Sequence, residues 1–158
     1  MSPAELLQEA LVLLAAWGPQ SPGAAPRCVY RMGADLDGNP IGCDCSAFVA
    51  RCHRGRKFDG RRWYNTDAIY ADAQAAEPRR WRQIAEPVPG AIGVYPGRIR
   101  NGKRTAGHVW VIEDVPTCTT IECCSSGKGI KRMKRPAWFA RGAVGNGKPI
   151  LFAEYIGG

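Results

Sequence analysis

The residues of this chain best suited to chemistry are a cysteine and the histidine that could act on it. Cys45 lies in residues 42–49, GCDCSAFV, directly after Asp44. Asp44 is a favourable helix N-cap, because its carboxylate can accept a free backbone N–H of the first turn. We therefore expect Cys45 in the first turn of a helix, where the positive end of the helix dipole favours the nucleophilic thiolate over the thiol.

Two histidines, His53 and His108, are the available bases for this thiol. His53 follows Cys45 on the same expected helix, and the helical rise would separate the two by roughly 12 Å, too far for a hydrogen bond. His108 instead opens the apolar run 108–112, which is typical of a buried β-strand. The sequence thus predicts His108 as the base.

A third polar group follows in the next β-rich run, residues 119–124, which contains Glu122. If the two runs form adjacent antiparallel strands, Glu122 can lie beside the imidazole of His108. A carboxylate there would orient the ring and stabilise its protonated form. The order cysteine, histidine, polar residue is typical of a thiol peptidase triad.

Several segments, taken in order, resemble the NlpC-type cell-wall cysteine peptidases, whose compact domain has a papain-like fold. The resemblance covers roughly residues 30–130 and rests on Tyr30-Arg31-Met32-Gly33, Asp44–Val49, Pro89–Tyr95 and Gly107-His108-Val109. Glu122 stands where the family places its third catalytic residue. Related cell-wall amidases of the CHAP type use acidic residues at that place.

The resemblance implies hydrolysis of amide bonds in bacterial peptidoglycan stem peptides, between D-glutamate and the diamino acid. Carried onto this sequence, Cys45 would be the nucleophile and His108 the general base and then the acid. Glu122 would orient His108. The hydroxyl of Tyr30 and the backbone N–H of Cys45 would stabilise the oxyanion, each such donor being typically worth roughly 3 kcal/mol in the transition state.

Three further residues are expected to meet the substrate. Asp44 and Ser46 flank the nucleophile and would hold amine or peptide groups of the substrate. Trp110 stands where a small residue is common beside the family's histidine, which would narrow the cleft. An N-acetylmuramoyl-L-alanine amidase of the same fold is an alternative, as is a catalytically inactive phage structural module.

The formal net charge of +8 favours an anionic partner. The densest basic run, residues 128–135, could guide anionic peptidoglycan. A basic nucleic-acid-binding module is the rival class, with Trp63, Tyr64 and Trp81 as platforms for base stacking. No helix-turn-helix, zinc-finger or RRM signature supports that rival, so nucleic acid is not the expected partner.

Seven cysteines leave open whether the chain contains disulfides. Six remain beside the nucleophile and could form three bridges outside the cytoplasm, or stay reduced. The spacing of Cys43, Cys45, Cys52 and His53 is not that of a zinc knuckle. Neither a metal nor an organic cofactor is therefore expected.

One α+β domain is expected over residues 1–158, with N-terminal helices packed on an antiparallel sheet in a papain-like, NlpC-type fold. A capping box at Ser2 and Glu5 begins a helix over about 3–17 that packs on the core, and Asn65 can cap a third helix. The motifs fall within about 28–130, and residues 78–89 are expected as a connection. Strands are expected near residues 91–95, 108–113, 119–124 and 150–155.

Glu5 and Glu9, with no basic region before them, argue against a secretory signal. No apolar stretch reaches the roughly 20 residues that span a bilayer. We therefore expect a monomer made in the cytoplasm that reaches the cell wall after lysis or by delivery through a phage or secretion system. A delivery or immunity partner would accompany that route.

Overall fold

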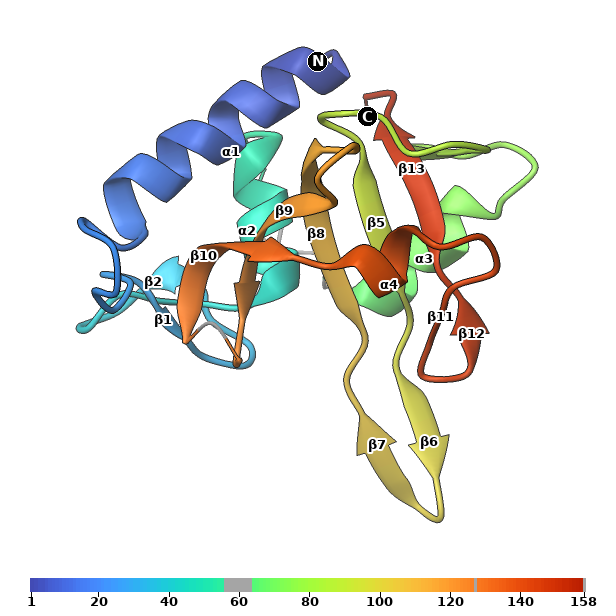
Figure 1. The fold of residues 1–158 in the computed structure, drawn as a ribbon. Coiled ribbons are helices and arrows are strands. Elements are labelled where there is room, and N and C mark those ends of the chain that lie inside the picture. Colours follow the sequence, from blue (N-terminus) through green and yellow to red (C-terminus); the bar gives the residue numbers. More distant parts are fainter. Residues whose placement is uncertain (56–63, 127, 158) are drawn as a thin grey trace.

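The computed structural model describes residues 1–55, 64–126 and 128–157. Its centre is a nine-stranded sheet in the order β2-β3-β1-β10-β9-β8-β5-β13-β4 (Figure 1). These strands are β1 (Val29–Tyr30), β2 (Asp35–Asp37), β3 (Gly42–Cys43), β4 (Trp81–Ile84), β5 (Ile92–Tyr95), β8 (His108–Asp114), β9 (Thr119–Cys124), β10 (Gly129–Lys134) and β13 (Leu151–Tyr155). The helices of the described residues are α1 (Pro3–Trp17), α2 (Cys45–Cys52), α3 (Thr66–Ala73) and α4 (Pro136–Phe139).

The four strands expected from the sequence are present, as β5, β8, β9 and β13. They are consecutive in the sheet and antiparallel, with Tyr95 opposite His108 on β5 and β8 and Val111 opposite Ile121 on β8 and β9. The adjacency of β8 and β9 brings the strand of His108 beside the strand of Glu122. The sheet is antiparallel apart from the short parallel pair β1 and β3.

The expected caps set the starts of the first three helices. The Ser2 hydroxyl accepts the Glu5 N–H at 3.3 Å, and the Glu5 carboxylate accepts the Ser2 N–H at 2.6 Å, which completes the capping box of α1. Asn65 accepts the Ala68 N–H at 2.9 Å and caps α3. Each cap satisfies a backbone donor that has no partner within its own helix.

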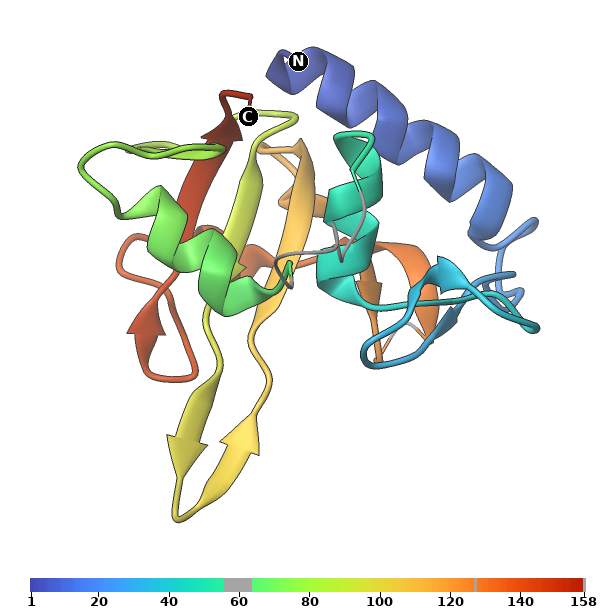
Figure 2. The same cartoon turned by 180° about the vertical axis from the view of Figure 1, so that it is seen from behind.

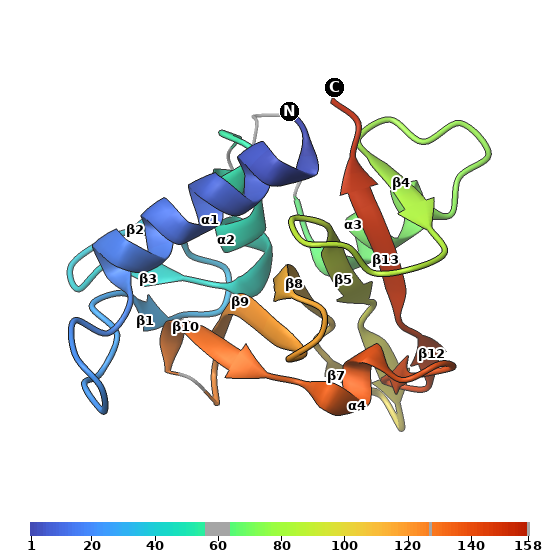
Figure 3. The same cartoon turned by 45° about the horizontal axis from the view of Figure 1, so that its top comes forward.

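The helices lie on different sides of the sheet. Helices α2 and α3 cover one face (Figure 2), while α4 lies against the other (Figure 1). Helix α1 runs along one edge of the molecule beside α2 (Figure 3). The main buried cluster includes Leu6 of α1, Phe48 of α2, Val111 of β8 and Ala153 of β13, so the N-terminal helix shares the core of the sheet. A second cluster around Trp110 and Ile112 lies on the α4 face.

Some strands differ from expectation. Residues 78–89 include β4, where Trp81 is buried and the next two residues are exposed, so the segment forms an edge strand with little apolar signal. Three short strands, β1 to β3, separate the first two helices, and the basic run 128–135 contains β10. A hairpin of β6 (Arg98–Arg100) and β7 (Lys103–Thr105) projects from the body (Figure 1), and β11 (Val144–Gly145) pairs with β12 (Lys148–Pro149).

Membrane-spanning segments were sought among the helices that the structure describes. None of them combines the length and the apolar character needed to cross a bilayer.

Candidate active site

Cys45 is the first residue of α2, and Asp44 fixes it there. One carboxylate oxygen of Asp44 accepts the Ala47 N–H at 2.9 Å and the Ser46 hydroxyl at 2.9 Å. The other oxygen accepts the Gly33 N–H at 2.9 Å and so binds the loop after β1 to the start of the helix. The side chain of Asp44 therefore holds together the turn that presents Cys45.

His108 lies between the Cys45 thiol and the Glu122 carboxylate. Its Nε2 is 2.7 Å from Oε2 of Glu122, and the Cys45 thiol lies close enough to the ring to raise its pKa. Because Nε2 is taken by Glu122, Nδ1 is the nitrogen left for the sulfur. The side chain of His108 is 12% exposed and that of Glu122 is fully buried, so their ion pair is shielded from water.

The surroundings of His108 and Glu122 favour their charged forms. Burial lowers the pKa of His108, but the hydrogen bonds and negative charges of Cys45 and Glu122 outweigh it and raise the pKa to about 10. Burial raises the pKa of Glu122, and its hydrogen bonds to His108 and Arg135 reverse this and lower it to about 2. The pair is accordingly an imidazolium and a carboxylate at neutral pH.

Two further residues hold the Glu122 carboxylate. Arg135 donates through Nε to Oε1 at 2.9 Å and through Nη2 to Oε2 at 3.0 Å, a bidentate arrangement that also raises the pKa of the guanidinium. The Thr120 hydroxyl donates to Oε1 at 2.7 Å. The sequence reasoning missed both. Thr120 shares a strand face with Glu122 and was detectable by the two-residue period, whereas Arg135 was one cation among several in a basic run.

Two tyrosines lie near the thiol. The pKa of Tyr30 is raised by burial and by the nearby negative charges of Cys45 and Asp44, so its hydroxyl keeps its proton and can donate a hydrogen bond. Burial, followed by the charges of Cys45 and Glu122, likewise raises the pKa of Tyr95. Tyr95 was assigned only to a strand by the sequence, and β5 carries it directly opposite His108.

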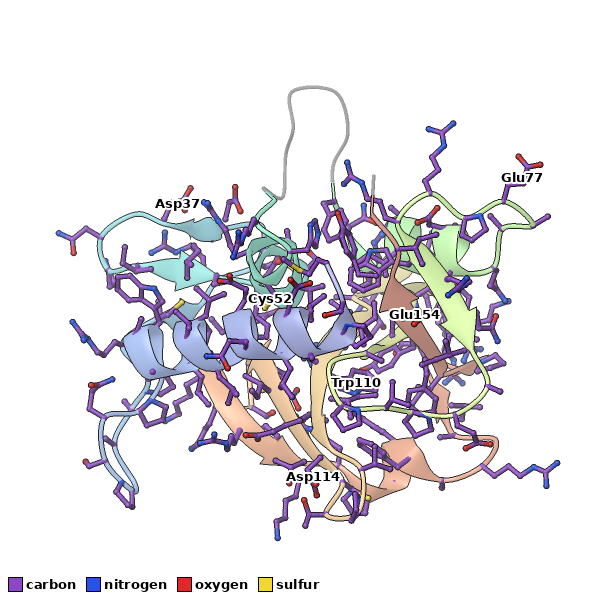
Figure 4. The ribbon with its side chains drawn as sticks, turned by 90° about the horizontal axis from the view of Figure 1, so that it is seen from above. Asp37, Cys52, Glu77, Trp110, Asp114 and Glu154 are labelled. Carbon is purple, nitrogen blue, oxygen red and sulfur yellow. The ribbon has the colours of Figure 1, made fainter. Side chains whose placement is uncertain are left out.

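Aromatic rings support the histidine from the α4 face. Trp110 is fully buried and stacks on His108 with ring centroids 5.9 Å apart, and Trp138 lies 4.3 Å from Trp110. Figure 4 shows Trp110 among the side chains between the strands. The guanidinium of Arg135 lies 4.4 Å from the Trp138 ring centroid. Trp110 therefore supports the ring of His108 and does not line an open surface in this structure.

The expected substrate contacts of Asp44 and Ser46 fall on buried side chains. Asp44 is 2% exposed and Ser46 is 3% exposed, and they are hydrogen-bonded to each other. Either could reach a substrate only if the cap of α2 opened. Their role in binding stays a prediction, and their observed role is to position Cys45.

His53 is remote from this chemistry, as its spacing predicted. It is the C-cap of α2 and stacks on Tyr155 at a centroid distance of 4.7 Å. Burial, together with the positive charge of Arg80, lowers the pKa of His53 to about 4. It is therefore a neutral core histidine at pH 7.

The aromatic residues proposed for base stacking do not form an exposed platform. Trp81 is 1% exposed and donates its Nε1–H to the Tyr64 hydroxyl at 2.6 Å, and Tyr64 is 8% exposed. Both rings belong to the main buried cluster. Trp63, the third of the set, lies outside the described residues. The nucleic-acid-binding alternative thereby loses two of its three stacking residues.

The family of the chain follows from a comparison of its sequence with known domains. The CHAP domain matches residues 34–124, which is more than half of the chain and includes Cys45, His108 and Glu122. The chain belongs to the CHAP family, whose members are cysteine- and histidine-dependent amidohydrolases and peptidases that act on peptidoglycan. It is therefore a cysteine-dependent peptidoglycan hydrolase, in agreement with the resemblance to NlpC-type peptidases and with the mixed α and β fold. A comparison with curated proteins finds no match.

Proposed function

We propose that this protein cleaves the stem-peptide bond between D-glutamate and the diamino acid of peptidoglycan, through a Cys45–His108–Glu122 triad in an NlpC-type arrangement. The position of His108, between the thiol of Cys45 and the buried carboxylate of Glu122, is the observation that carries the proposal. A histidine in this position can activate the sulfur and protonate the leaving amine.

The reaction is a two-step acyl transfer. The Cys45 thiol gives its proton to His108, and the sulfur attacks the carbonyl carbon and forms a carbon–sulfur bond. His108 then gives that proton to the departing amine as the carbon–nitrogen bond breaks. A water molecule then loses a proton to His108 and attacks the thioester, which releases the acid and restores the cysteine. Glu122 keeps the ring of His108 oriented and stabilises its charge in both steps.

The negative oxygen that forms in each step needs hydrogen-bond donors. The backbone N–H of Cys45 and the Tyr30 hydroxyl are the proposed donors. Tyr30 retains its proton, which it donates in the structure to Sδ of Met32 at 3.8 Å, so it would turn to the oxyanion when substrate binds. Loss of one such donor typically costs roughly 3 kcal/mol of transition-state stabilisation. Tyr30→Phe should therefore lower kcat by about 10².

The excess of positive charge suits an anionic wall polymer, but part of the basic run 128–135 has internal partners. Arg132 pairs with Glu113 at 2.8 Å, and Arg135 holds Glu122. Lys131 and Lys134 are the cations of β10 for which no ion pair is found within the described part of the chain. The route to the wall, by lysis or by phage or secretion-system delivery, and any immunity partner remain part of this proposal.

Digestion of purified sacculi tests the proposal. Cys45→Ala should lower fragment release by at least about 10³, while Cys118→Ala, a control at the loop between β8 and β9, should retain it. Mass spectrometry of the fragments should find a new amino terminus on the diamino acid. A free L-alanine amino terminus would favour the muramoyl-alanine amidase instead, and undiminished digestion by Cys45→Ala would exclude this nucleophile.

A further inference from the structure

Three thiols lie close together in the main buried cluster. The sulfur atoms of Cys28, Cys43 and Cys123 all lie within 4.8 Å of one another, and each side chain is fully buried. None of the three is part of a disulfide. This is the one group of three or more potential metal ligands found among residues 1–55, 64–126 and 128–157.

The thiols come from three separate segments. Cys28 directly precedes β1, Cys43 ends β3, and Cys123 lies on β9. No spacing motif joins them, so no local pattern predicts a metal site at these three residues. Gly129 on β10 allows the close packing here, because a Cβ at this residue would fall 1.8 Å from the Cys28 carbonyl oxygen and its φ is +153°. The fold thus gathers the sulfur atoms through tight backbone packing.

The separations suit a thiophilic cation. Thiolates bound to zinc at ~2.3 Å in a tetrahedral site stand ~3.8 Å from one another, which is within the observed limit. Cuprous copper accepts three thiolates as a complete trigonal set, and soft sulfur ligands select such cations. Hard cations such as magnesium or calcium prefer oxygen ligands and do not fit this set.

The surroundings offer further ligand oxygens. The Cys123 thiol donates to the Cys43 carbonyl oxygen at 3.1 Å, and the Cys43 thiol donates to the Asp44 carbonyl oxygen at 3.1 Å. When a cation displaces the thiol protons to solvent, these carbonyl oxygens lose their hydrogen-bond donors and are left free to bind the cation. One of them can supply the fourth ligand that a structural zinc ion requires.

We propose that Cys28, Cys43 and Cys123 form a structural binding site for a thiophilic d10 cation, zinc or cuprous copper. Binding replaces three S–H bonds by three metal–sulfur bonds and releases the three protons to solvent, with no change of oxidation state. Because the thiols are fully buried, the cation enters during folding or through local opening.

The proposed ion would be bound by segments that also carry residues of the candidate active site, a property that goes beyond the proposed function. Each of these cysteines lies within two residues of a group in the candidate active site: Cys28 of Tyr30, Cys43 of Cys45 and Cys123 of Glu122. One ion would fix the relative positions of β1, β3 and β9. Its expected effect is stability, and it takes no part in the chemical step.

Metal analysis of the full chain tests this inference. The protein, folded with zinc under reducing conditions or with cuprous copper under anaerobic conditions, should hold about one ion per chain. The triple variant Cys28→Ser/Cys43→Ser/Cys123→Ser should lose at least about tenfold of that content. Cys52→Ala, a buried cysteine of α2 outside the cluster (Figure 4), should keep it, as should the inactive Cys45→Ala.

A measurement on the parent chain covers the case in which the triple variant fails to fold. Cobalt(II) in place of zinc should give strong thiolate-to-metal absorption, and chelator should lower the Tm of the zinc-loaded chain. A folded chain that takes up neither cation would overturn the proposal. The proposal would also be overturned if the triple variant retained the metal or if Cys45→Ala lost it. A disulfide within the cluster of the isolated protein would overturn it too.

Discussion

At the scale of single residues, the charge on His108 depends on its two neighbours. The pKa of His108 is about 10, whereas that of an ordinary histidine is 6.5. The contacts of the protonated ring therefore stabilise the fold fully below about pH 6.5, and this stabilisation is lost as the pH rises toward 10. The pKa of Glu122, about 2 against an ordinary 4.5, gives stabilisation above about pH 4.5 that is lost toward pH 2. The pair therefore stabilises the fold most between about pH 4.5 and 6.5.

Substitution of the carboxylate should move the titration of the histidine. Glu122→Gln removes a negative charge 2.7 Å from Nε2 of His108 and should lower its pKa by about 1–3. NMR titration of the imidazole protons measures this directly, with His53 as an internal control whose low pKa should not change. Titration of His108 near pH 6.5 in both proteins would contradict the observed contacts.

Arg135 offers a second test, because it compensates a fully buried carboxylate. Arg135→Met leaves Glu122 without its bidentate partner and should lower the free energy of unfolding by about 2–3 kcal/mol. This loss is somewhat smaller than for a fully buried ion pair, because the side chain of Arg135 is 21% exposed. Arg132→Met is the matched control: its pair with Glu113 has an Arg that is 56% exposed, and its loss should cost about 0–1 kcal/mol. Urea denaturation distinguishes them, and equal losses would refute a special role for Arg135.

At the scale of elements, the start of α2 should be more sensitive than an ordinary helix cap. Asn65→Ala removes a single cap bond of α3 and should cost about 1 kcal/mol. Asp44→Ala removes the cap of α2 together with the bond to Gly33, and should cost about 2 kcal/mol or more and reduce activity by displacing Cys45. Thermal unfolding and sacculus digestion measure the two effects. Equal stability losses with full activity would argue against a positioning role.

The elements predictable from sequence are those with strong local signals. Ser2, Asp44 and Asn65 cap helices through bonds to residues three positions away, and β8 and β9 are runs of six or more residues rich in β-branched and apolar types. The strands β1 to β3 are two or three residues long and owe their pairing to distant partners. Their existence depends on tertiary contacts, which no local pattern records.

The same distinction between local sequence signals and distant contacts applies to the residues of the candidate site. The order of Cys45, His108 and Glu122, together with the family resemblance, predicted a triad, and the pairing of β8 with β9 places His108 beside Glu122. Arg135 directly follows β10, which ends opposite Thr119 at the start of β9, and its side chain extends to the Glu122 carboxylate. The sequence indicates Arg135 only indirectly, because a buried carboxylate needs a compensating positive charge and β10 is rich in cations.

At the scale of the whole molecule, the N-terminal helix is packed onto the turn that leads into β5. Gly90 lies in this turn with φ +84°, and a Cβ there would fall 1.8 Å from the carbonyl oxygen of Pro3 at the start of α1. Leu6, Ala10 and Leu14 of α1 are buried in the main cluster, so displacement of the helix would expose apolar surface. The position of α1 thus depends on the absence of a side chain at Gly90.

Gly90→Ala should therefore detach the beginning of α1, whereas Gly23→Ala provides a control for backbone strain alone. Gly23 has nearly the same conformation, φ +82°, but a Cβ there meets nothing within 4 Å. The control should lose about 1 kcal/mol or less from the positive φ, and Gly90→Ala should lose at least about 2 kcal/mol more from the steric clash. Urea denaturation gives the energies, and limited proteolysis should release the N-terminal segment only from Gly90→Ala. Equal energies and equal protection would mean that α1 tolerates displacement and that the core does not require the contact of α1 with the turn before β5.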